Sequence, residues 1–168
     1  ENEKNILDHF YKDTTRWCFT FQVNALITRS ISINKPQESK YRFVERSVYT
    51  DKYVFAENSY KSGNMNQIEM DLYNMYFDWI QCHFETKPDG IIYLRADPKT
   101  SFERIKKRSR DEESIIPLEY ITKIHDNHEK WLNNEKNVLI LDANVEFENN
   151  KKNFNEMIEK IKRFIQTQ

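Results

Sequence analysis

The sequence predicts an α/β fold in which helices flank a parallel sheet. Two short apolar runs, Gly90–Leu94 and Val138–Leu141, are continuous rather than alternating, a pattern typical of strands that are covered on both faces. A third apolar run, Tyr41–Val44, is also expected to form a strand. Apolar residues at helical spacing lie before, between and after these runs, and this alternation favours parallel strands joined by helices.

The N-terminal part is expected to be one long helix, from Ile6 to about Ser32. One stripe of this helix comprises Trp17, Phe21, Ala25 and Thr28. The next segment, Ile33–Lys40, contains Asn, Pro, Gln and Ser, so we expect a loop there.

Four further helices are expected after this loop. Asn66 and Glu69 form a capping-box pattern that opens the first of them. Asp97 followed by Pro98 opens the second, which extends to about Arg108. The apolar positions at helical spacing are Ile68, Leu72, Met75, Trp79 and Ile80 in the first helix, Leu118, Ile121, Ile124, His128, Trp131 and Leu132 in the third, and Phe154, Met157, Ile158, Ile161, Phe164 and Ile165 in the last.

Length, charge and cysteine content restrict the class of protein. The 168 residues suit one compact domain, expected over residues 1–168. A net charge of −1 gives no overall field that attracts nucleic acid, and no apolar run is long enough to span a membrane, so we expect neither as a partner. Two cysteines without metal-ligand spacing favour a reduced, cytoplasmic protein. The start at Glu1, without Met, leaves an organellar targeting segment upstream open.

The glycine content is informative, since only Gly63 and Gly90 occur. A P-loop requires several glycines, which let backbone N–H groups approach the phosphates, followed by Lys and Ser or Thr. This chain contains no such sequence, so an anionic partner must be met by a local cluster of side chains.

One candidate motif, Glu45-Arg46-Ser47, directly follows the expected strand Tyr41–Val44. Ligands of open α/β sheets bind beyond the carboxyl ends of the strands. A carboxylate at that place can hold Mg²⁺ together with its waters, and a guanidinium can hold a phosphate. The alternative is a surface ion pair at the end of a strand.

A second candidate is the basic run on the helix that ends near Arg108. Arg104 and Arg108 are four positions apart, so their like charges crowd one helix face unless a polyanion binds there. Neutralisation of a triphosphate is the obvious use of such a cluster, whereas a solvated helix end is the alternative. The run comprises Arg104, Lys106, Lys107, Arg108 and Arg110, and is followed by Asp111, Glu112 and Glu113.

A third candidate is Phe19-Thr20-Phe21-Gln22. A carboxamide beside an aromatic ring can hydrogen-bond the edge of a nucleobase while the ring stacks on its face. The alternative is an amphipathic helix whose aromatic side chains belong to the core.

Together, and in this order, these motifs resemble the deoxynucleoside kinase family. The resemblance runs nearly from end to end and is carried by Arg16 to Gln22, Glu45 to Phe55, Pro88 to Leu94, Arg104 to Glu113, and Ile116 to Tyr120. It implies a P-loop-kinase-like parallel sheet, a lid at about residues 104–115, and transfer of the γ-phosphoryl group of ATP or another nucleoside triphosphate. The acceptor implied is the 5′-hydroxyl of a deoxynucleoside, and a homodimer is expected.

The resemblance also implies a role for each matching residue. Gln22 reads the base edge, Phe21 and Phe55 pack on the base, and Leu7 and Phe10 line the pocket. Tyr11 and Glu113 hold the sugar 3′-hydroxyl, Glu45 helps to place Mg²⁺, and Arg46 lies near the reacting 5′-hydroxyl. The lid arginines Arg104, Arg108 and Arg110 contact the donor phosphates, and Glu146 and Phe147 lie near the donor base.

One pair bears on the choice of base. The resemblance pairs Arg29, which lies seven residues after Gln22, with Asp51. Family members that prefer deoxycytidine and deoxypurines carry this pair, so we expect these substrates rather than thymidine. Two solvated charges are the alternative.

The chain departs from the family pattern at its start. Family members begin with a strand, a P-loop and a carboxylate that accepts the 5′-hydroxyl proton, and none of the three occurs in these 168 residues. We therefore expect that catalysis requires such an upstream segment. The alternative is a catalytically inactive subunit that binds nucleosides or serves in dimerisation.

Overall fold

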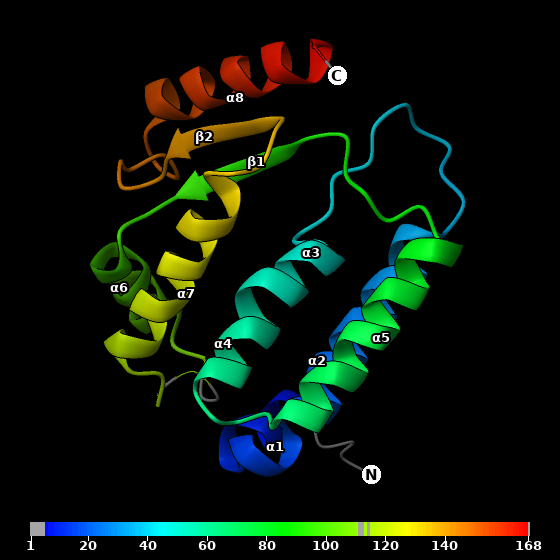
Figure 1. Cartoon of the computed structure of the whole chain (residues 1–168). Coiled ribbons are helices and arrows are strands. Elements are labelled where there is room, and N and C mark those ends of the chain that lie inside the picture. The colour runs from blue at the N-terminus through cyan, green and yellow to red at the C-terminus, as the bar shows by residue number, and fades with distance from the viewer. Residues whose placement is uncertain (1–5, 111–112, 114, 168) are drawn as a thin grey trace, which may run out of the picture. The chain divides into compact units, whose positions relative to one another are not determined.

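The computed structural model describes residues 6–110, 113 and 115–167 (Figure 1). The chain divides into two compact units, Glu1–Lys87 and Pro88–Gln168. In the described part of the chain, no helix is both long enough and apolar enough to cross a membrane.

The regular structure described in the first unit is entirely helical. Helix α2 contacts α1, α3, η1 and α5, and in Figure 1 it runs alongside α5. The elements are α1 (Ile6–Lys12), α2 (Thr14–Ile33), α3 (Val48–Thr50), the π-helical segment η1 (Asp51–Ala56), α4 (Glu57–Lys61) and α5 (Gln67–His83).

The long N-terminal helix expected from the sequence is two helices, α1 and α2. Asp13 separates them and caps α2, because its side chain accepts a hydrogen bond from the backbone N–H of Arg16 at 3.1 Å. An aspartate beside the first turn competes with helix continuation by offering the backbone a side-chain acceptor.

The stripe expected along the N-terminal helix borders the face that α2 buries: Trp17 and Phe21 are partly buried and pack against the core, and Ala25 is half-buried. The buried side chains are Cys18, Gln22, Leu26 and Ser30. Thr28, from the expected stripe, is exposed. Apolar residues occur on both sides of α2, so its sequence alone does not indicate which side packs; the contacts with α5 and η1 decide it.

Helix α5 begins as expected. Asn66 accepts a hydrogen bond from the N–H of Glu69 at 3.0 Å, and the Glu69 carboxylate accepts one from the N–H of Asn66 at 2.9 Å, which completes the capping box. The buried face consists of Met70, Tyr73, Phe77 and Ile80. On another face Ile68, Met75 and Trp79 are exposed, so α5 is apolar on two faces.

The strand expected at Tyr41–Val44 is not formed. The segment has no regular secondary structure, no strand of the described residues pairs with it, and Tyr41, Phe43 and Val44 are exposed. Arg42 holds the segment in place instead, because its guanidinium donates to the carbonyl of Ile33, the last residue of α2, and to those of Lys35 and Pro36 in the loop that follows. An apolar run becomes a strand only where another strand supplies hydrogen-bond partners.

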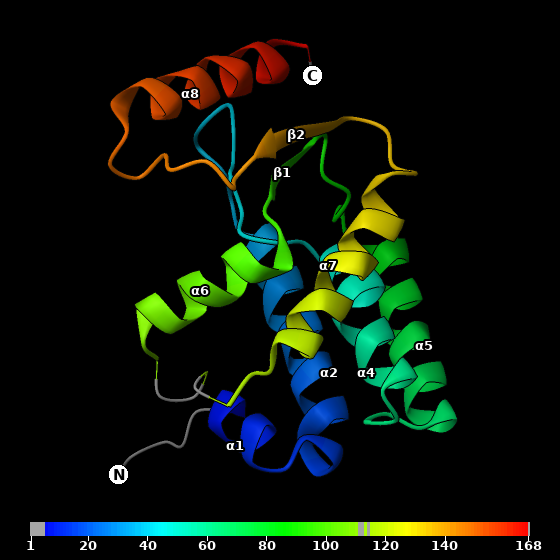
Figure 2. The same cartoon turned by 90° about the vertical axis from the view of Figure 1, so that its left-hand side faces the viewer.

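The second unit is built on a parallel strand pair, as the sequence predicts. Strands β1 (Ile91–Arg95) and β2 (Val138–Asp142) are neighbours, with Ile91 opposite Val138 and Arg95 opposite Asp142. Helices α6 (Pro98–Arg108) and α7 (Leu118–Leu132) lie on one side of this pair, and α8 (Lys151–Gln166) lies on the other (Figures 1 and 2). The α/β class and the bounds of these elements are therefore confirmed to within a few residues.

Helix α6 starts after Asp97 with Pro98 in its first turn, as expected. No hydrogen bond within the described residues makes the Asp97 side chain a cap of this helix. The N–H of Asp97 donates instead to the side-chain oxygen of Asn144 at 2.8 Å. This bond ties the start of α6 to the loop that follows β2.

Candidate functional site

The π-helical segment η1 carries two of the expected pocket residues, Asp51 and Phe55. It continues from α3, whose first turn Ser47 and Thr50 cap reciprocally. The N–H of Glu57 donates to the carbonyl of Lys52, five residues earlier, as π-helical geometry requires. Such segments are rare in helices and recur at functional sites, because the extra residue redirects the side chains around it.

Arg29 of α2 is bound at two points. Its Nε lies 2.7 Å from Oδ2 of Asp51, and its Nη1 donates to the backbone carbonyl of Glu45 at 2.6 Å. The Asp51 side chain is 4% exposed and that of Arg29 is 22% exposed, so the pair is largely withdrawn from water. Burial raises the pKa of the Asp51 carboxyl, although the Arg29 hydrogen bond and the charges of Arg29 and Arg46 act in the opposite direction.

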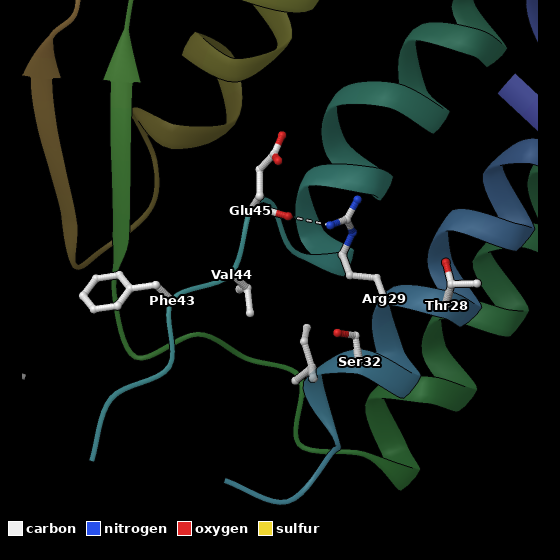
Figure 3. Close-up of a pocket in the computed structure, with 7 residues that line it drawn as sticks. Thr28, Arg29, Ser32, Phe43, Val44 and Glu45 are labelled. Atoms are coloured by element: carbon white, nitrogen blue, oxygen red, sulfur yellow. Dashed lines mark hydrogen bonds between the residues drawn. The ribbon is translucent and has the colours of Figure 1, made fainter. Parts of the chain in front are cut away.

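A pocket of about 440 Å³ opens beside this pair. Figure 3 shows Arg29 reaching from α2 to the backbone of Glu45, while Thr28 and Ser32 lie on the same helix. The pocket is lined by Thr28, Arg29, Ser32, Ile33, Phe43, Val44 and Glu45. Two of the expected functional residues, Arg29 and Glu45, therefore line one cavity.

Glu45 and Arg46 follow the unpaired segment 41–44. The Glu45 side chain is 92% exposed, and its Oε1 lies 4.0 Å from Nε of Arg46. Arg46 has φ 66°, in the left-handed region, where a non-glycine residue typically costs about 1–3 kcal/mol. Its guanidinium lies over the Phe55 ring, 4.6 Å from the centroid, which is within the range of a cation–π interaction.

Three of the aromatic residues expected in the pocket, Phe10, Tyr11 and Phe21, lie together in the first unit. The rings of Phe10 and Phe21 stack at 4.7 Å between centroids, and Phe10 meets Tyr11 edge-on at 5.2 Å. Leu7 packs against the same core cluster. Gln22 is 3% exposed, and its amide nitrogen lies 3.5 Å from Oγ of Ser59.

In the second unit, Glu113 joins two of the lid arginines. Nη2 of Arg108 lies 2.5 Å from Oε2 of Glu113, and Nη1 of Arg110 lies 3.6 Å from Oε1. The Glu113 side chain is 11% exposed, whereas both arginines are about half exposed. A second pocket, of about 270 Å³, is lined by Arg110 and Glu113 together with Phe102, Ile105, Lys106, Ser109 and Ile116.

The third lid arginine, Arg104, faces the loop after β2. Its guanidinium carbon lies 5.5 Å from the centroid of the Phe147 ring. The neighbouring Glu146 accepts a hydrogen bond from the N–H of Asn149 at 3.0 Å. This bond, with smaller effects from the charges of Lys107 and Arg104, lowers the pKa of Glu146.

Two residues at these sites were not suggested by the sequence. Ser59 contacts Gln22, and the buried Tyr73 of α5 interacts electrostatically with Asp51 and Arg29. Neither belongs to a motif, and only tertiary structure brings them to the site. Asp111, Glu112 and Ser114 of the expected lid lie outside the described residues. Within the residues that are described, no cluster of three or more His, Cys, Asp or Glu side chains could hold a metal ion.

Comparison with known proteins covers almost the whole chain. The family model for deoxynucleoside kinase matches residues 1–166. Human deoxycytidine kinase is 40% identical over 187 residues, which span 99% of this chain and 71% of the human protein. Deoxycytidine kinase 2 of Gallus gallus is 39% identical, over 96% of this chain and 68% of the chicken protein. Human mitochondrial thymidine kinase 2 is 41% identical, over 76% of this chain and 48% of its own length.

Proposed function

Because this chain belongs to the deoxynucleoside kinase family, whose members are phosphotransferases, we propose that it transfers the γ-phosphoryl group of ATP or another nucleoside triphosphate to the 5′-hydroxyl of deoxycytidine or a purine deoxynucleoside. The observation that carries this choice of acceptor is the largely buried pair of Arg29 and Asp51. Relatives named for deoxycytidine and for thymidine both match, so their names alone leave the base undecided.

The first unit supplies the chemistry for recognising a base. Gln22 offers a carboxamide that donates and accepts, and Phe21 and Phe55 offer ring faces. Arg29 lies two turns after Gln22 on α2, and Asp51 holds its guanidinium at 2.7 Å. A guanidinium that is fixed in this way presents donors to acceptor atoms on cytosine or a purine, and it occupies the space that the thymine methyl group needs.

The phosphoryl transfer itself is attributed to positioning and charge. The 5′-oxygen forms the new bond to the γ-phosphorus, the bond from that phosphorus to the β-phosphate oxygen breaks, and the hydroxyl proton passes to a base. Arg46 would hold the reacting end of the acceptor. Arg104, Arg108 and Arg110 would stabilise the charge that develops on the phosphates, the largest electrostatic contribution in such reactions. Phe147 and Glu146 would flank the donor base.

Glu45 is the residue proposed to hold Mg²⁺. Its donor is a carboxylate oxygen, the ligand type that this ion prefers, and its 92% exposure leaves room for an ion that retains its waters. Mg²⁺ bound to the triphosphate would neutralise charge on the transferring group.

The sugar is proposed to be recognised through its 3′-hydroxyl, by Tyr11 and Glu113. A phenol and a carboxylate together can donate to and accept from one hydroxyl. When the hydroxyl is missing, polar groups that are built to bind it lose their partner, at a cost of about 1–3 kcal/mol.

The test is a substrate panel on the full-length protein. The specificity constants kcat/KM for deoxycytidine, deoxyadenosine, deoxyguanosine and thymidine are measured with ATP and Mg²⁺, and 2′,3′-dideoxycytidine is added as a sugar control. We expect at least one of the first three to exceed thymidine, and deoxycytidine to exceed the dideoxy analogue by roughly tenfold, as expected from about 1.4 kcal/mol. A preference for thymidine would contradict the base assignment. Equal constants for the two cytidine analogues would contradict the Tyr11–Glu113 assignment.

A homodimer is also proposed, and the second apolar face of α5 supports it. Ile68, Met75 and Trp79 recur at helical spacing and are 72%, 57% and 54% exposed. Such a stripe on a helix that already buries its opposite face is typical of an association surface. Sedimentation of the wild-type protein and of the Trp79→Glu variant tests this: a dimer is expected for the first and a monomer for the second, whereas two identical monomers would contradict it.

A further inference from the structure

Gln22 of α2 and Ser59 of α4 form a buried polar contact. Gln22 is 3% exposed and Ser59 is 5% exposed, and Nε2 of Gln22 lies 3.5 Å from Oγ of Ser59. Within the part of the chain that the structure describes, this is the single hydrogen bond of the Gln22 side chain. The carbonyl oxygen Oε1 of Gln22 and its second amide hydrogen therefore remain available to a ligand.

The hydroxyl of Ser59 has one proton, and that proton is already used. Oγ of Ser59 donates to the backbone carbonyl of Phe55, four residues earlier, at 2.8 Å. The backbone of Ser59 is also held, because its carbonyl accepts from the N–H groups of Asn64 and Met65 at 2.9 and 3.3 Å. A hydroxyl that donates to one partner can only accept from another, so the part of Gln22 that faces Ser59 is the amide N–H and not the carbonyl oxygen.

This contact removes a freedom that a glutamine side chain otherwise has. The last torsion of glutamine is roughly two-fold, so an isolated amide exchanges its nitrogen and oxygen at little cost. At Gln22 the exchanged orientation would place Oε1 against the lone pairs of Ser59, or would make Ser59 give up its bond to Phe55. Either outcome leaves a buried polar group unsatisfied, which is unfavourable. The Gln22 carboxamide therefore presents its donor and its acceptor in one preferred order.

The order of donor and acceptor decides which bases a carboxamide can read. Cytosine and adenine carry an exocyclic amino group beside a ring nitrogen that accepts, whereas thymine and guanine carry an exocyclic oxygen beside a ring N–H. An amide that is held in one orientation matches one of these two classes and meets the other with donor facing donor and acceptor facing acceptor. The proposed preference for deoxycytidine over thymidine assigns the orientation at Gln22 to the amino class.

We propose that Ser59 is a positioning residue for base selection: it holds the Gln22 carboxamide in the orientation that suits cytosine and adenine and opposes thymine and guanine. The inference rests on the proposed function, in which Gln22 reads the base edge. It narrows the proposed acceptors to deoxycytidine and deoxyadenosine. The effect of Ser59 on the base is exerted through Gln22.

Ser59→Ala in the full-length protein is the direct test, since it removes the hydroxyl and lets the amide exchange its two ends. The ratios of kcat/KM for deoxycytidine over thymidine and for deoxyadenosine over deoxyguanosine should both fall by roughly tenfold, the size of one hydrogen bond. For deoxycytidine the change should lie in KM rather than in kcat, because binding of the base is weakened and the reacting 5′-hydroxyl is unaffected. Ser59→Thr keeps a hydroxyl that can donate to the same carbonyl, so it should preserve both ratios. Wild-type ratios in Ser59→Ala would overturn the proposal.

Ser30→Ala is the matched control. Ser30 is also 5% exposed, and its Oγ donates to the carbonyl of Leu26, four residues earlier on α2, at 2.7 Å. The variant thus loses the same kind of local bond, and in the described residues no hydrogen bond joins the Ser30 hydroxyl to Gln22. We expect Ser30→Ala to keep both ratios. If the two alanine variants lower the ratios equally, the effect follows from the loss of any buried hydroxyl and the inference is wrong.

Gln22→Met separates this inference from the proposed function, because methionine has a similar length and no amide. If Gln22→Met leaves both ratios unchanged, Gln22 does not read the base, and the inference falls with that part of the proposed function. If it changes the ratios and Ser59→Ala does not, only the role of Ser59 is contradicted. In the Gln22→Met background, Ser59→Ala should have no further effect on the ratios, because its partner is gone.

A crystal structure of the wild-type protein with bound deoxycytidine is a second measurement that does not depend on a variant folding. We expect Oε1 of Gln22 within hydrogen-bond distance of the exocyclic amino nitrogen, and Nε2 still within hydrogen-bond distance of Oγ of Ser59. A Gln22 side chain that binds the base after turning away from Ser59 would contradict the proposal.

Discussion

Arg29 and Asp51 meet at 2.7 Å, from Nε to Oδ2, although 22 positions separate them in the chain. Arg29 comes from the C-terminal part of α2, and Asp51 is the first residue of the π-helical segment η1. Because Asp51 is almost completely buried, its negative charge is tolerated only with a cation beside it. The orientation of the Arg29 guanidinium therefore depends on how α2 and η1 are placed against each other.

The first prediction concerns the removal of this pair. Arg29→Met combined with Asp51→Ala should raise kcat/KM for thymidine relative to deoxycytidine, because the charge and the bulk beside the base are both lost. The double change is preferred, since removing one partner leaves a buried charge unpaired at a cost of about 3–5 kcal/mol. Steady-state kinetics of wild type and variant decide the matter. No gain in relative thymidine use would remove the basis for the assignment.

The second prediction concerns stability and pH. Burial raises the pKa of Asp51 above that of an unfolded aspartate, so between the two values the folded state binds more protons than the unfolded state. The contribution of Asp51 to the free energy of unfolding is therefore full below the unfolded pKa of about 3.9 and is lost as the pH rises through the folded pKa.

Denaturant unfolding of wild type and Asp51→Asn across the acidic range measures this contribution. Over the window just above pH 4, the wild-type free energy of unfolding should fall relative to that of the variant, by at most about 1.4 kcal/mol per pH unit. The unpaired Arg29 shifts the variant by a constant amount, because arginine does not titrate there. Parallel curves, or a difference of the opposite sign, would show that the pKa of Asp51 is not raised.

The third prediction concerns the lid arginines. Arg110→Ala should reduce kcat by roughly 100- to 1000-fold, as is typical when one donor to developing charge is removed. The fold should be unaffected, because the Arg110 side chain is 59% exposed and its contact with Glu113 at 3.6 Å is a partly exposed ion pair of small stabilising effect. Lys99→Ala removes an exposed positive charge from α6, the helix that precedes Arg110, and should keep wild-type turnover. Equal activity of all three proteins would mean that the basic run is only a solvated helix end.

The fourth prediction concerns the two cysteines. Cys18 is fully buried, and burial raises the pKa of its thiol, whereas Cys82 is exposed. Because the thiolate is the reactive form, iodoacetamide should label Cys82 in the folded protein and both residues in denaturant. Peptide mass mapping reads out each site, and Cys82→Ser should leave neither of these two sites labelled under native conditions. Labelling of native Cys18 would contradict its placement in the core.

The elements of the second unit could be predicted because their signals are local. The runs that became β1 and β2 are continuous and apolar, Pro98 marks the start of α6, and hydrophobic spacing marks α7 and α8. Each signal lies within the element it specifies, so no knowledge of distant contacts is needed. The capping box of Asn66 and Glu69 is local in the same way.

Only part of the candidate site could be predicted from the sequence. The resemblance to a kinase family suggested that Arg29 and Asp51 pair, and the structure has this ion pair. No pattern suggested the contact of Gln22 with Ser59 or the cation–π contact of Arg46 with Phe55. Each of these contacts depends on where two helices cross or on how a loop turns. The spacing of residues in the sequence predicts neither the crossing nor the turn.

By itself, the sequence determined the helices and strands of the second unit, the start of α5, the parallel class of the sheet and the family of the chain. Tertiary structure decided that segment 41–44 stays unpaired, that α2 buries Gln22 and Leu26 rather than Thr28, and that a π-helical segment carries Asp51. The physical reason is the range of the interactions. Helix caps and hydrophobic periodicity act over a few residues. The pairing of strands, the choice of a buried helix face and the formation of ion pairs depend on residues that are distant in sequence and come together only when the chain folds.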